Sequence, residues 1–307
     1  MKFCGFYFIL IFYIEKRWDM KTGLIVEGGG MKCAYSAGVL DGFIDEGITF
    51  DYCIGVSAGA ANAVSFLAGQ RGRNLRFYTE YSKSPKYFGL RSFISTGNLF
   101  GLDYIYGELS ASNGVDPVDY DALMRNPCEF ECAATDVITG RAKYFTKSQM
   151  TPDDFSIIKA TSALPVVSQP VEIDGCFYYD GGVSDSIPIY RTMEEIGCDV
   201  VVVLLSKPDD YVMERQGHKP IYHKVLEQYP EVIRAIDHRH ERYNAQFQEV
   251  KKYEAEGRAK VFSTPKMDDM GPYSTDPKIA VMLYKSGLYD CQTKANEIKE
   301  FLRKDEG

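Results

Sequence analysis

The order of predicted elements near the start of the chain limits its fold more than any other sequence feature. Two strand-like segments, residues 22–27 and 50–56, are each followed by a glycine-containing turn and then by a helix-like segment, residues 31–46 and 57–68. In the first helix the apolar residues recur at amphipathic spacing and stop at Gly47. Strands that alternate with helices run parallel and are covered by helices on both faces. We therefore predict an α/β fold, a three-layer α/β/α sandwich with a mostly parallel central sheet.

Further strand and helix signals continue this pattern along the chain. They are paired strands at residues 129–135 and 142–145, a helix at 153–163, a hairpin at 171–179 that turns at Asp174-Gly175, and a Val-rich buried strand at 199–205. Between them, residues 71–119 show weaker periodicity and many aromatic side chains. We predict that residues 71–119 form an irregular cap over the edge of the sheet, with ordinary core packing as the alternative.

The composition changes toward the C-terminus to charged sequence with helical periodicity. Apolar residues recur at helical spacing over residues 225–236, where Pro230 marks the start of a helix, and another helix begins at Pro277. We therefore divide the chain into an α/β domain at residues 20–207 and a mainly helical C-terminal extension at residues 208–307. The extension contains no residue pattern that indicates chemistry.

Residues 1–19 precede this pattern and form an apolar extension. Residues 3–14 are an almost uninterrupted apolar run, shorter than the roughly 20 residues that a helix needs to span a bilayer. Three interpretations stay open: a spurious or dispensable extension with translation starting at Met20, a membrane-surface anchor, or a secretory signal. We expect a cytoplasmic protein, with peripheral attachment to a membrane as the alternative.

The composition excludes several classes of protein. The chain has 307 residues, of which 45% are hydrophobic, enough for a substantial core, and its 22 Tyr and 18 Phe residues argue against disorder. Its 43 acidic and 35 basic residues give a formal net charge of −8. A nucleic-acid partner requires a basic face that displaces counterions from phosphates. We therefore expect no nucleic-acid partner.

Neither the cysteines nor the histidines indicate a metal site. None of the eight cysteines belongs to a C-x-x-C pair, and most lie in apolar or strand-like sequence, so we expect reduced, buried thiols. The four histidines all fall in the C-terminal extension, at His218, His223, His238 and His240. We expect no metal ion and no cofactor.

The strongest chemical signal is a serine between two glycines. Gly55-Val56-Ser57-Ala58-Gly59 forms G-x-S-x-G between a predicted strand and a predicted helix. Glycines on both sides permit the tight turn that lifts a nucleophilic hydroxyl out of the sheet, and the helix N-terminus favours negative charge. The motif predicts Ser57 as a nucleophile, with Gly55 and Gly59 forming the turn. The alternative is that Ser57 only caps the helix.

A run of glycines follows the first predicted strand. It presents several backbone N–H groups just before a helix, either as an oxyanion hole or as a phosphate cradle, in the segment Gly28-Gly29-Gly30-Met31-Lys32. The dinucleotide fingerprint G-x-G-x-x-G is absent because its last glycine is missing, and the chain has no P-loop sequence. We therefore expect no nucleotide partner.

A serine nucleophile needs a base, and Asp180 offers one. Asp180-Gly181-Gly182 directly follows a predicted strand, and the glycines allow other backbone to approach closely. An isolated Asp-Gly-Gly is most often a turn. Here, however, three glycine-bounded motifs each follow a strand end, where α/β folds place their sites. Their combination favours one shared site, with Gly181 and Gly182 supporting Asp180.

The three motifs, in this order and spacing, resemble the patatin-like phospholipase family of bacterial-type serine acyl hydrolases. Residues 160–165, Ala-Thr-Ser-Ala-Leu-Pro, also resemble the segment that ends a helix before the catalytic aspartate in that family. The resemblance covers residues 22–207 and implies that Ser57 is the nucleophile and Asp180 the general base. It also implies that residues 28–32 form the oxyanion hole.

One residue of the glycine run departs from the family pattern. The family more often has arginine where this chain has Lys32. Lysine keeps the positive charge but loses the planar fork, which puts a bidentate role in doubt.

The resemblance implies a lipid acyl hydrolase, phospholipase A-like, that cleaves carboxylic esters of phospholipids or related lipids through a Ser-Asp dyad and an acyl-enzyme, without a cofactor. Its partner is then a lipid or membrane-surface substrate. Two other functions stay open: an esterase, thioesterase or acyltransferase acting on a non-lipid ester, and a non-catalytic lipid-binding protein on the same scaffold. Intact Ser57 and Asp180 speak against the non-catalytic protein. The sequence contains no signal for an oligomeric state.

Overall fold

The computed structural model describes residues 20–89, 92–94, 97–266 and 276–303. Within them the strands form one sheet: β1 (Thr22–Val26), β2 (Tyr52–Val56), β3 (Glu129–Asp136), β4 (Ala142–Thr146), β5 (Val171–Ile173), β6 (Cys176–Asp180), β7 (Val200–Leu205) and β8 (Ala259–Ser263). The strand order is β5-β6-β3-β2-β1-β7-β8, and β4 pairs with β3 beside this path. Strands β3, β2, β1, β7 and β8 are parallel neighbours, whereas β4, β5 and β6 pair antiparallel. The prediction of a mostly parallel central sheet is confirmed.

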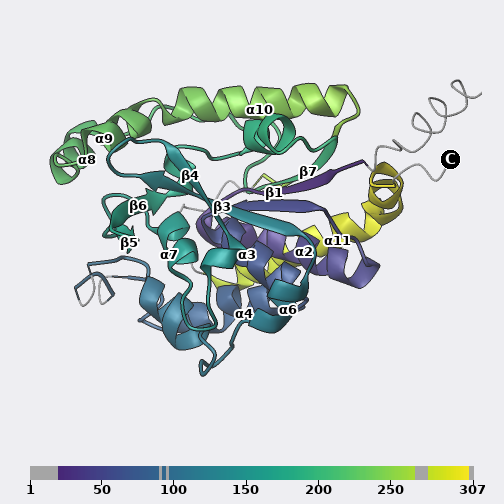
Figure 1. Cartoon of the computed structure of the whole chain (residues 1–307), viewed down its shortest axis with the longest axis horizontal. Helices are drawn as coiled ribbons and strands as arrows, with labels where there is room; N and C mark the ends of the chain where they lie inside the picture. Colours follow the sequence, from purple (N-terminus) through teal and green to yellow (C-terminus); the bar gives the residue numbers. More distant parts are fainter. Residues whose placement is uncertain (1–19, 90–91, 95–96, 267–275, 304–307) are drawn as a thin grey trace, which may run out of the picture.

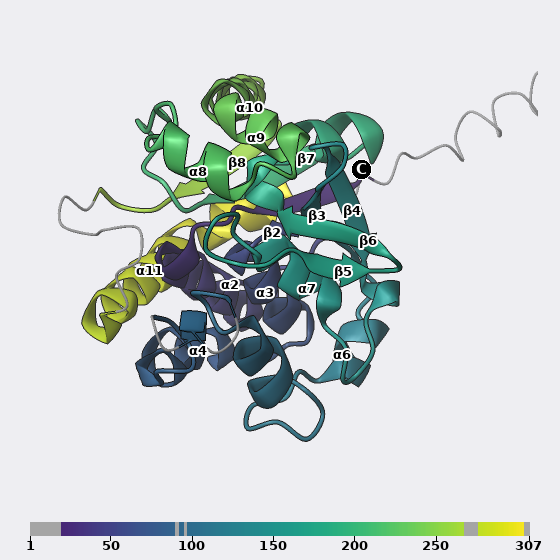
Figure 2. The same ribbon diagram turned by 90° about the vertical axis from the view of Figure 1, so that its left-hand side faces the viewer.

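Helices cover both faces of the sheet (Figure 1). On one face lie α2 (Ala34–Glu46), α3 (Ala58–Leu67), α4 (Arg73–Thr79), α6 (Tyr120–Arg125), α7 (Ser156–Ser162) and α11 (Pro277–Phe301). On the other face lie α8 (Lys219–Val225), α9 (Pro230–Asp237) and α10 (Arg239–Ala255), as Figure 2 shows from a second direction. The predicted three-layer α/β/α sandwich is therefore confirmed.

The central strands separate two apolar layers. In β1, Leu24 and Val26 belong to the cluster that includes α2 and α3, whereas Ile25 packs in a second cluster with Tyr243 and Phe247 of α10. Successive residues of a strand point to opposite faces, so a fully apolar strand requires a helical layer on each side. This packing fixes the positions of the strand ends and of the turns that follow them.

Turn and cap residues begin and end several elements where the sequence predicts. Helix α2 ends at Gly47, whose φ of 66° is the left-handed conformation typical of a helix C-terminus. Helices α9 and α11 begin at Pro230 and Pro277. The β5–β6 hairpin turns through Asp174 and Gly175, which have φ values of 52° and 78°.

Residues 208–307 contribute to both the sheet and the helical layers. Their described part contains α8 to α11, in agreement with the predicted helical content, and also β8, a strand that the sequence analysis does not predict. Strand β8 extends the sheet as a parallel neighbour of β7. Helix α11 lies against α2, where a Cβ added at Gly38 would sit 2.0 Å from the carbonyl oxygen of Tyr284. The C-terminal region therefore shares one core with the α/β domain.

In residues 71–119, α4 packs against α11, α2 and α3, so the structure matches the core packing considered as the alternative. These residues contain α4 and short helical turns rather than one continuous element. The aromatic side chains of Phe77, Tyr78 and Tyr87 are buried in the main core and also line a cavity beside α3. The segment thus lines the cavity and is part of the core.

The predicted apolar extension at residues 1–19 lies outside the described residues. None of the helices in the described ranges is both long enough and apolar enough to cross a bilayer.

Candidate active site

Ser57 lies in a strained turn between β2 and α3. Its φ of 54° and ψ of −132° are unusual for a residue with a Cβ. A Cβ added at Gly55 would lie 2.3 Å from Ala60 Cα, and one added at Gly59 would lie 2.3 Å from the carbonyl oxygen of Val26. The two glycines therefore let α3 approach β1 and β2 closely enough to hold Ser57 in this turn.

The Ser57 backbone is held by a neighbouring element, and its side chain is left available. The Ser57 amide donates a hydrogen bond of 2.8 Å to Thr161 Oγ1, and the Thr161 hydroxyl donates to the carbonyl oxygen of Ala133. These contacts tie the turn to α7 and β3. The Ser57 hydroxyl makes no capping hydrogen bond to α3. The alternative that Ser57 serves only as a helix cap is thus not supported by its geometry.

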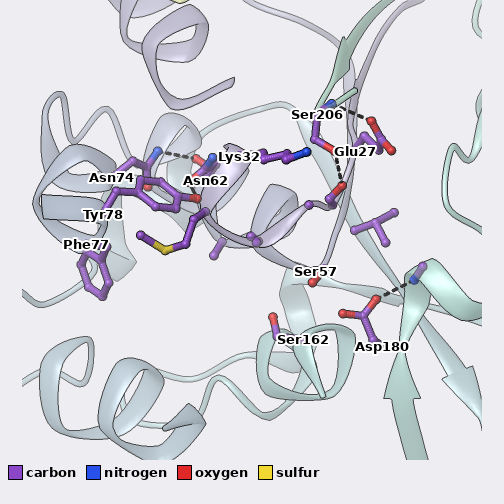
Figure 3. Close-up of a pocket in the computed structure, with 18 of the residues that line it drawn as sticks. Glu27, Lys32, Ser57, Asn62, Asn74, Phe77, Tyr78, Ser162, Asp180 and Ser206 are labelled. Carbon is purple, nitrogen blue, oxygen red and sulfur yellow. Dashed lines mark hydrogen bonds between the residues drawn. The ribbon is translucent and has the colours of Figure 1, made fainter. Parts of the chain in front are cut away.

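Asp180 ends β6 and is almost completely buried, with 3% of its surface exposed. Its amide donates to the carbonyl oxygen of Ala163 at 2.8 Å, and its Oδ1 accepts a hydrogen bond of 2.7 Å from the Gly182 amide. Its Oδ2 makes no hydrogen bond within the described part of the chain. In Figure 3 the carboxylate oxygen that is not bonded to Gly182 points toward Ser57. One oxygen is therefore anchored and the other faces the serine.

Burial sets the acidity of this carboxyl group. It raises the pKa of Asp180 to about 6, while the Ser57 hydroxyl, the Gly182 amide and the positive charge of Arg239 act in the opposite direction. The Ser57 hydroxyl is thus close enough to stabilise the carboxylate, although the geometry falls short of a well-formed hydrogen bond. Such contacts are often loose before substrate binds.

The glycine run lies directly against the serine. A Cβ added at Gly28 would be 2.8 Å from Ser57 Cβ, so only glycine fits there. Residues 30–33 form a 3₁₀ turn in which the Lys32 amide donates to the carbonyl oxygen of Gly29 at 3.2 Å. The first N–H groups of a helical turn have no partner within it, so the amides of Gly30 and Met31 are the candidates in this run for binding another acceptor. The structure thus brings the run and Ser57 together, as the sequence predicts.

Two residues after β7 complete this wall of the site, and the sequence analysis does not identify them. The Ser206 hydroxyl donates to the carbonyl oxygen of Gly28 at 2.6 Å, and its amide donates to the buried Glu27 carboxylate at 2.6 Å. The Lys207 ammonium donates to Ser206 Oγ at 3.1 Å and lies 3.9 Å from Glu27 Oε1. The ends of β1 and β7 therefore pin the glycine run in place.

Arg239, at the start of α10, is a third residue that sequence reasoning does not find. Its Nε donates to the carbonyl oxygen of Gly182 at 2.5 Å. The next turn of the helix places Arg242 Nη2 2.6 Å from the carbonyl oxygen of Val183. A single arginine in a charged helix carries no sequence signal, so this link between the C-terminal region and the Asp180 loop is visible only in the fold.

Ser57 and Asp180 open into a cavity of about 630 Å³. Most of the wall formed by residues 71–119 and α7 is apolar. Its side chains include Phe77, Tyr87, Phe100, Leu102, Ile105 and Ile158, and Phe155, directly before α7, lies in the same lining. Figure 3 shows Ser57, Ser162 and Asp180 on one side of this cavity and Phe77 and Tyr78 on another. The cavity offers an apolar chain a path that ends at the serine.

The histidines lie away from this cavity. Within the described residues, none of the four lines it; His223 lies 3.3 Å from Asp237, and His238 lies 3.0 Å from Glu241. The same residues contain no group of three or more histidine, cysteine or acidic side chains able to hold a metal ion. Asp180 is therefore the candidate base that the geometry places beside Ser57.

Comparison with known proteins gives matches over most of the chain. Residues 24–193 match the family described as Patatin-like phospholipase, and residues 229–303 match a domain of unknown function, DUF6363. The Escherichia coli (strain K12) protein described as "Uncharacterized protein YjjU" is 28% identical over 214 residues, which are 65% of this chain and 56% of that protein. The chain thus spans little more than half the length of that relative. The crystal structure of VipD from Legionella pneumophila aligns with 91% of this chain and 67% of its own, at 12% identity and a TM-score of 0.43.

Proposed function

Because this chain belongs to the patatin-like phospholipase family, we propose that it hydrolyses carboxylic esters of lipids with a Ser57-Asp180 dyad. Membership of the family supports lipid acyl hydrolysis in general. One observation carries the specific assignment: the free oxygen of a buried aspartate faces a serine in a strained strand-to-helix turn, inside a largely apolar cavity. Nucleophile and base within reach of each other are the signature of covalent catalysis.

The proposed reaction follows from the positions of these groups. Asp180 accepts the proton of the Ser57 hydroxyl as its oxygen attacks the ester carbonyl. The backbone N–H groups of residues 28–32 stabilise the oxyanion that forms on the carbonyl oxygen. The alcohol leaves with a proton from Asp180, and water then attacks the acyl-enzyme, with Asp180 again acting as the base.

The environment of Asp180 makes a carboxylate an adequate base. An unperturbed aspartate, with a pKa of about 3.9, binds a proton too weakly to activate a serine efficiently. Burial raises the pKa of Asp180 to about 6, which increases its basicity while leaving it ionised at neutral pH. The Gly182 amide holds Oδ1, so that Oδ2 is left to receive the proton.

The lining of the cavity favours a lipid over a small polar ester. An acyl chain that lies along Phe77, Leu102 and Ile158 exchanges water for apolar contacts, and each buried methylene contributes about 0.8 kcal/mol. A non-lipid ester would gain little from this wall. The intact nucleophile and base likewise favour a hydrolase over a non-catalytic lipid-binding protein.

We therefore expect the purified protein to release fatty acid from long-chain lipid esters. The test is fatty-acid release from phospholipid, diacylglycerol and acyl-CoA thioester that carry the same acyl chain, with the Ser57→Ala variant as background. We expect a higher kcat/KM on the oxygen esters of the two lipids. A higher kcat/KM on the thioester would favour the non-lipid alternative. Equal fatty-acid release by the wild-type protein and the Ser57→Ala variant would exclude Ser57 as the nucleophile.

A second expected result concerns Arg239. Replacing it with methionine removes the hydrogen bond to Gly182 and a positive charge that lowers the pKa of Asp180. We expect kcat to fall about tenfold, in line with one lost charge-assisted hydrogen bond. We also expect the acidic limb of the pH–rate profile to move to higher pH, and Arg239→Lys to restore it in part.

Arg242 provides the matched control for Arg239. It lies one turn along the same helix and donates to Val183, yet it does not line the cavity. Arg242→Met should lower the melting temperature without moving the acidic limb. If both variants change only the melting temperature, Arg239 has a structural role and does not position Asp180.

A further inference from the structure

The cavity that contains Ser57 has two chemically different ends. Apolar side chains dominate the wall formed by residues 71–119 and α7, whereas Lys32 and Lys207 line the wall beside the ends of β1 and β7. The whole chain has a formal net charge of −8. Because the protein as a whole is acidic, two neighbouring lysines in the wall of a cavity are a local feature and do not reflect a generally basic surface.

Lys32 carries a positive charge that the protein does not neutralise directly. Its side chain is half-buried and extends toward Ser206 in Figure 3. Its ammonium group has no hydrogen-bond or ion-pair partner among the residues that the structure describes. Burial and the positive charge of Lys207 both lower the pKa of Lys32, and the charge of Glu27 opposes them. The two ammonium groups thus repel each other across the site.

Lys207 lies two hydrogen bonds from the glycine run. Its ammonium donates to Ser206 Oγ at 3.1 Å, and Ser206 donates to the carbonyl oxygen of Gly28 at 2.6 Å. The nearby Glu27 carboxylate already accepts the Ser206 amide at 2.6 Å and lies 3.9 Å from Lys207. The Glu27 carboxylate is therefore shared between the Ser206 amide and Lys207. A bound anion would neutralise the remaining positive charge of Lys32 and Lys207.

Three other cations of the cavity wall have partners of their own. Arg73 is buried and donates to Ser65 and Ser110, each at 2.9 Å, and to the Asp116 carbonyl oxygen. Lys266 is exposed and forms an ion pair of 3.0 Å with Asp210. Arg239, which also lines the cavity, donates to the carbonyl oxygen of Gly182. Among the described cations of the cavity wall, Lys32 is thus the one without a direct partner, and Lys207 shares the Glu27 carboxylate with the Ser206 amide.

We propose that Lys32 and Lys207 form an anion subsite that binds the negatively charged group of an acyl lipid while its acyl chain occupies the apolar end of the cavity. This inference rests on the proposed ester hydrolysis at Ser57 and specifies its substrate class. Lys32 belongs to the glycine run and Lys207 is linked to it through Ser206, so the proposal places the ester carbonyl at the run and the phosphate group beside the two ammonium groups. The cation of a zwitterionic headgroup is repelled there, so the subsite selects lipids with a net negative charge.

The test compares three lipids with identical acyl chains in mixed micelles of one neutral detergent: phosphatidylglycerol, phosphatidylcholine and diacylglycerol. We expect the wild-type protein to show the highest kcat/KM on phosphatidylglycerol. Because salt screens partly buried charges only in part, this preference should weaken but persist in roughly 1 M NaCl, where the Debye length is about 3 Å. Fatty-acid release without any preference at low salt would overturn the subsite but leave ester hydrolysis intact, whereas no release from any of the lipids would overturn the proposed function.

Lys207→Met is the variant that tests the subsite, and Lys285→Met is its matched control. Because this variant removes one charge-assisted hydrogen bond to the headgroup, the ratio of kcat/KM on phosphatidylglycerol to that on diacylglycerol should fall at least about tenfold. Lys285 is exposed on α11 and does not line the cavity, so its variant should keep the wild-type ratio. Lys207→Gln, which keeps a polar group, covers the case in which the methionine variant does not fold. An unchanged ratio in a folded Lys207 variant overturns the proposal.

Competition with inorganic phosphate tests whether the two lysines bind the headgroup of a lipid or a free anion. In the proposed subsite, phosphate competes weakly with phosphatidylglycerol, and Lys207→Met removes this competition. If phosphate binds tightly and depends on Lys207, while the three lipids are cleaved equally, the lysines hold a free anion and the lipid subsite is wrong.

Discussion

Replacing Ser57 with alanine should abolish ester hydrolysis while leaving the fold intact. In the proposed reaction Ser57 supplies the oxygen that becomes acylated, and no other group can take its place. Loss of the nucleophile in serine hydrolases lowers kcat by a factor on the order of 10⁶. The measurement is fatty-acid release from a lipid ester, with circular dichroism and the melting temperature to establish folding.

Ser162 offers a control within the same cavity. Its hydroxyl pairs with Tyr106 at 3.1 Å, and Figure 3 places it on the same side of the cavity as Ser57. Ser162→Ala should keep most of the activity, because Ser162 does not lie in a strand-to-helix turn. A folded Ser57→Ala variant with near-wild-type kcat, or a larger loss from Ser162→Ala, would show that the nucleophile is assigned wrongly.

Replacing Asp180 with asparagine should have an effect of similar size on catalysis. Asparagine keeps the volume and the hydrogen bond from Gly182, but it accepts no proton at neutral pH. Because two residues that act as a unit are not additive, the double variant with Ser57→Ala should be no worse than either single variant. The measurement is kcat/KM for the two single variants and the double variant.

The pH dependence tests the same residue in the wild-type protein. Asp180 must be ionised to act as a base, and its pKa is raised to about 6. Below that pH, kcat/KM should fall tenfold per pH unit, and above it the rate should level off. Asp185, buried and hydrogen-bonded to Tyr144 and Gln246, does not line the cavity. Asp185→Asn should therefore leave this limb in place.

The same raised pKa predicts that Asp180→Asn stabilises the protein. Between pH 3.8 and about 6 the unfolded chain releases the Asp180 proton while the folded protein retains it, so the free energy of unfolding falls as the pH rises. Above this range the full cost of ionising a buried carboxyl remains, at most about 3 kcal/mol. The asparagine variant avoids this cost. Its melting temperature should exceed that of the wild type at pH 7, and the difference should vanish near pH 4. An equal or lower melting temperature at pH 7 would contradict the raised pKa.

The local sequence predicts most of the sheet because local rules determine its elements. Three features show this: the Val-rich strand at residues 199–205, the two paired strands on either side of Gly140, and the hairpin turn at Asp174. In each of them the neighbouring residues favour the same structure. Strand β8 is short and mixed, Ala-Lys-Val-Phe-Ser, and it follows a long charged helix. Its pairing with β7 depends on the three-dimensional position of that helix, which single-sequence patterns do not contain.

In the candidate site too, residues in local motifs can be predicted from the sequence, whereas residues placed by long-range contacts cannot. Ser57, Asp180 and the glycine run have residue types and spacings that the backbone itself requires, so their motifs are visible in the sequence. Lys207 pairs with Glu27 and Arg239 donates to Gly182, both far away in the chain, and neither Lys207 nor Arg239 belongs to a motif. The sequence analysis predicts no chemistry for the C-terminal extension. The hydrogen bond from Arg239 to Gly182, beside Asp180, argues against that prediction.

The most direct test of the proposed dyad is the rate at which a fluorophosphonate modifies Ser57 as a function of pH. Mass spectrometry of the peptide that contains Ser57 gives both the position and the rate of the reaction. The proposed dyad predicts a single adduct on Ser57, a rate that rises through pH about 6 and then levels off, and almost no adduct in Asp180→Asn. An adduct on another residue, or a Ser57 adduct that forms equally fast in Asp180→Asn, would contradict it.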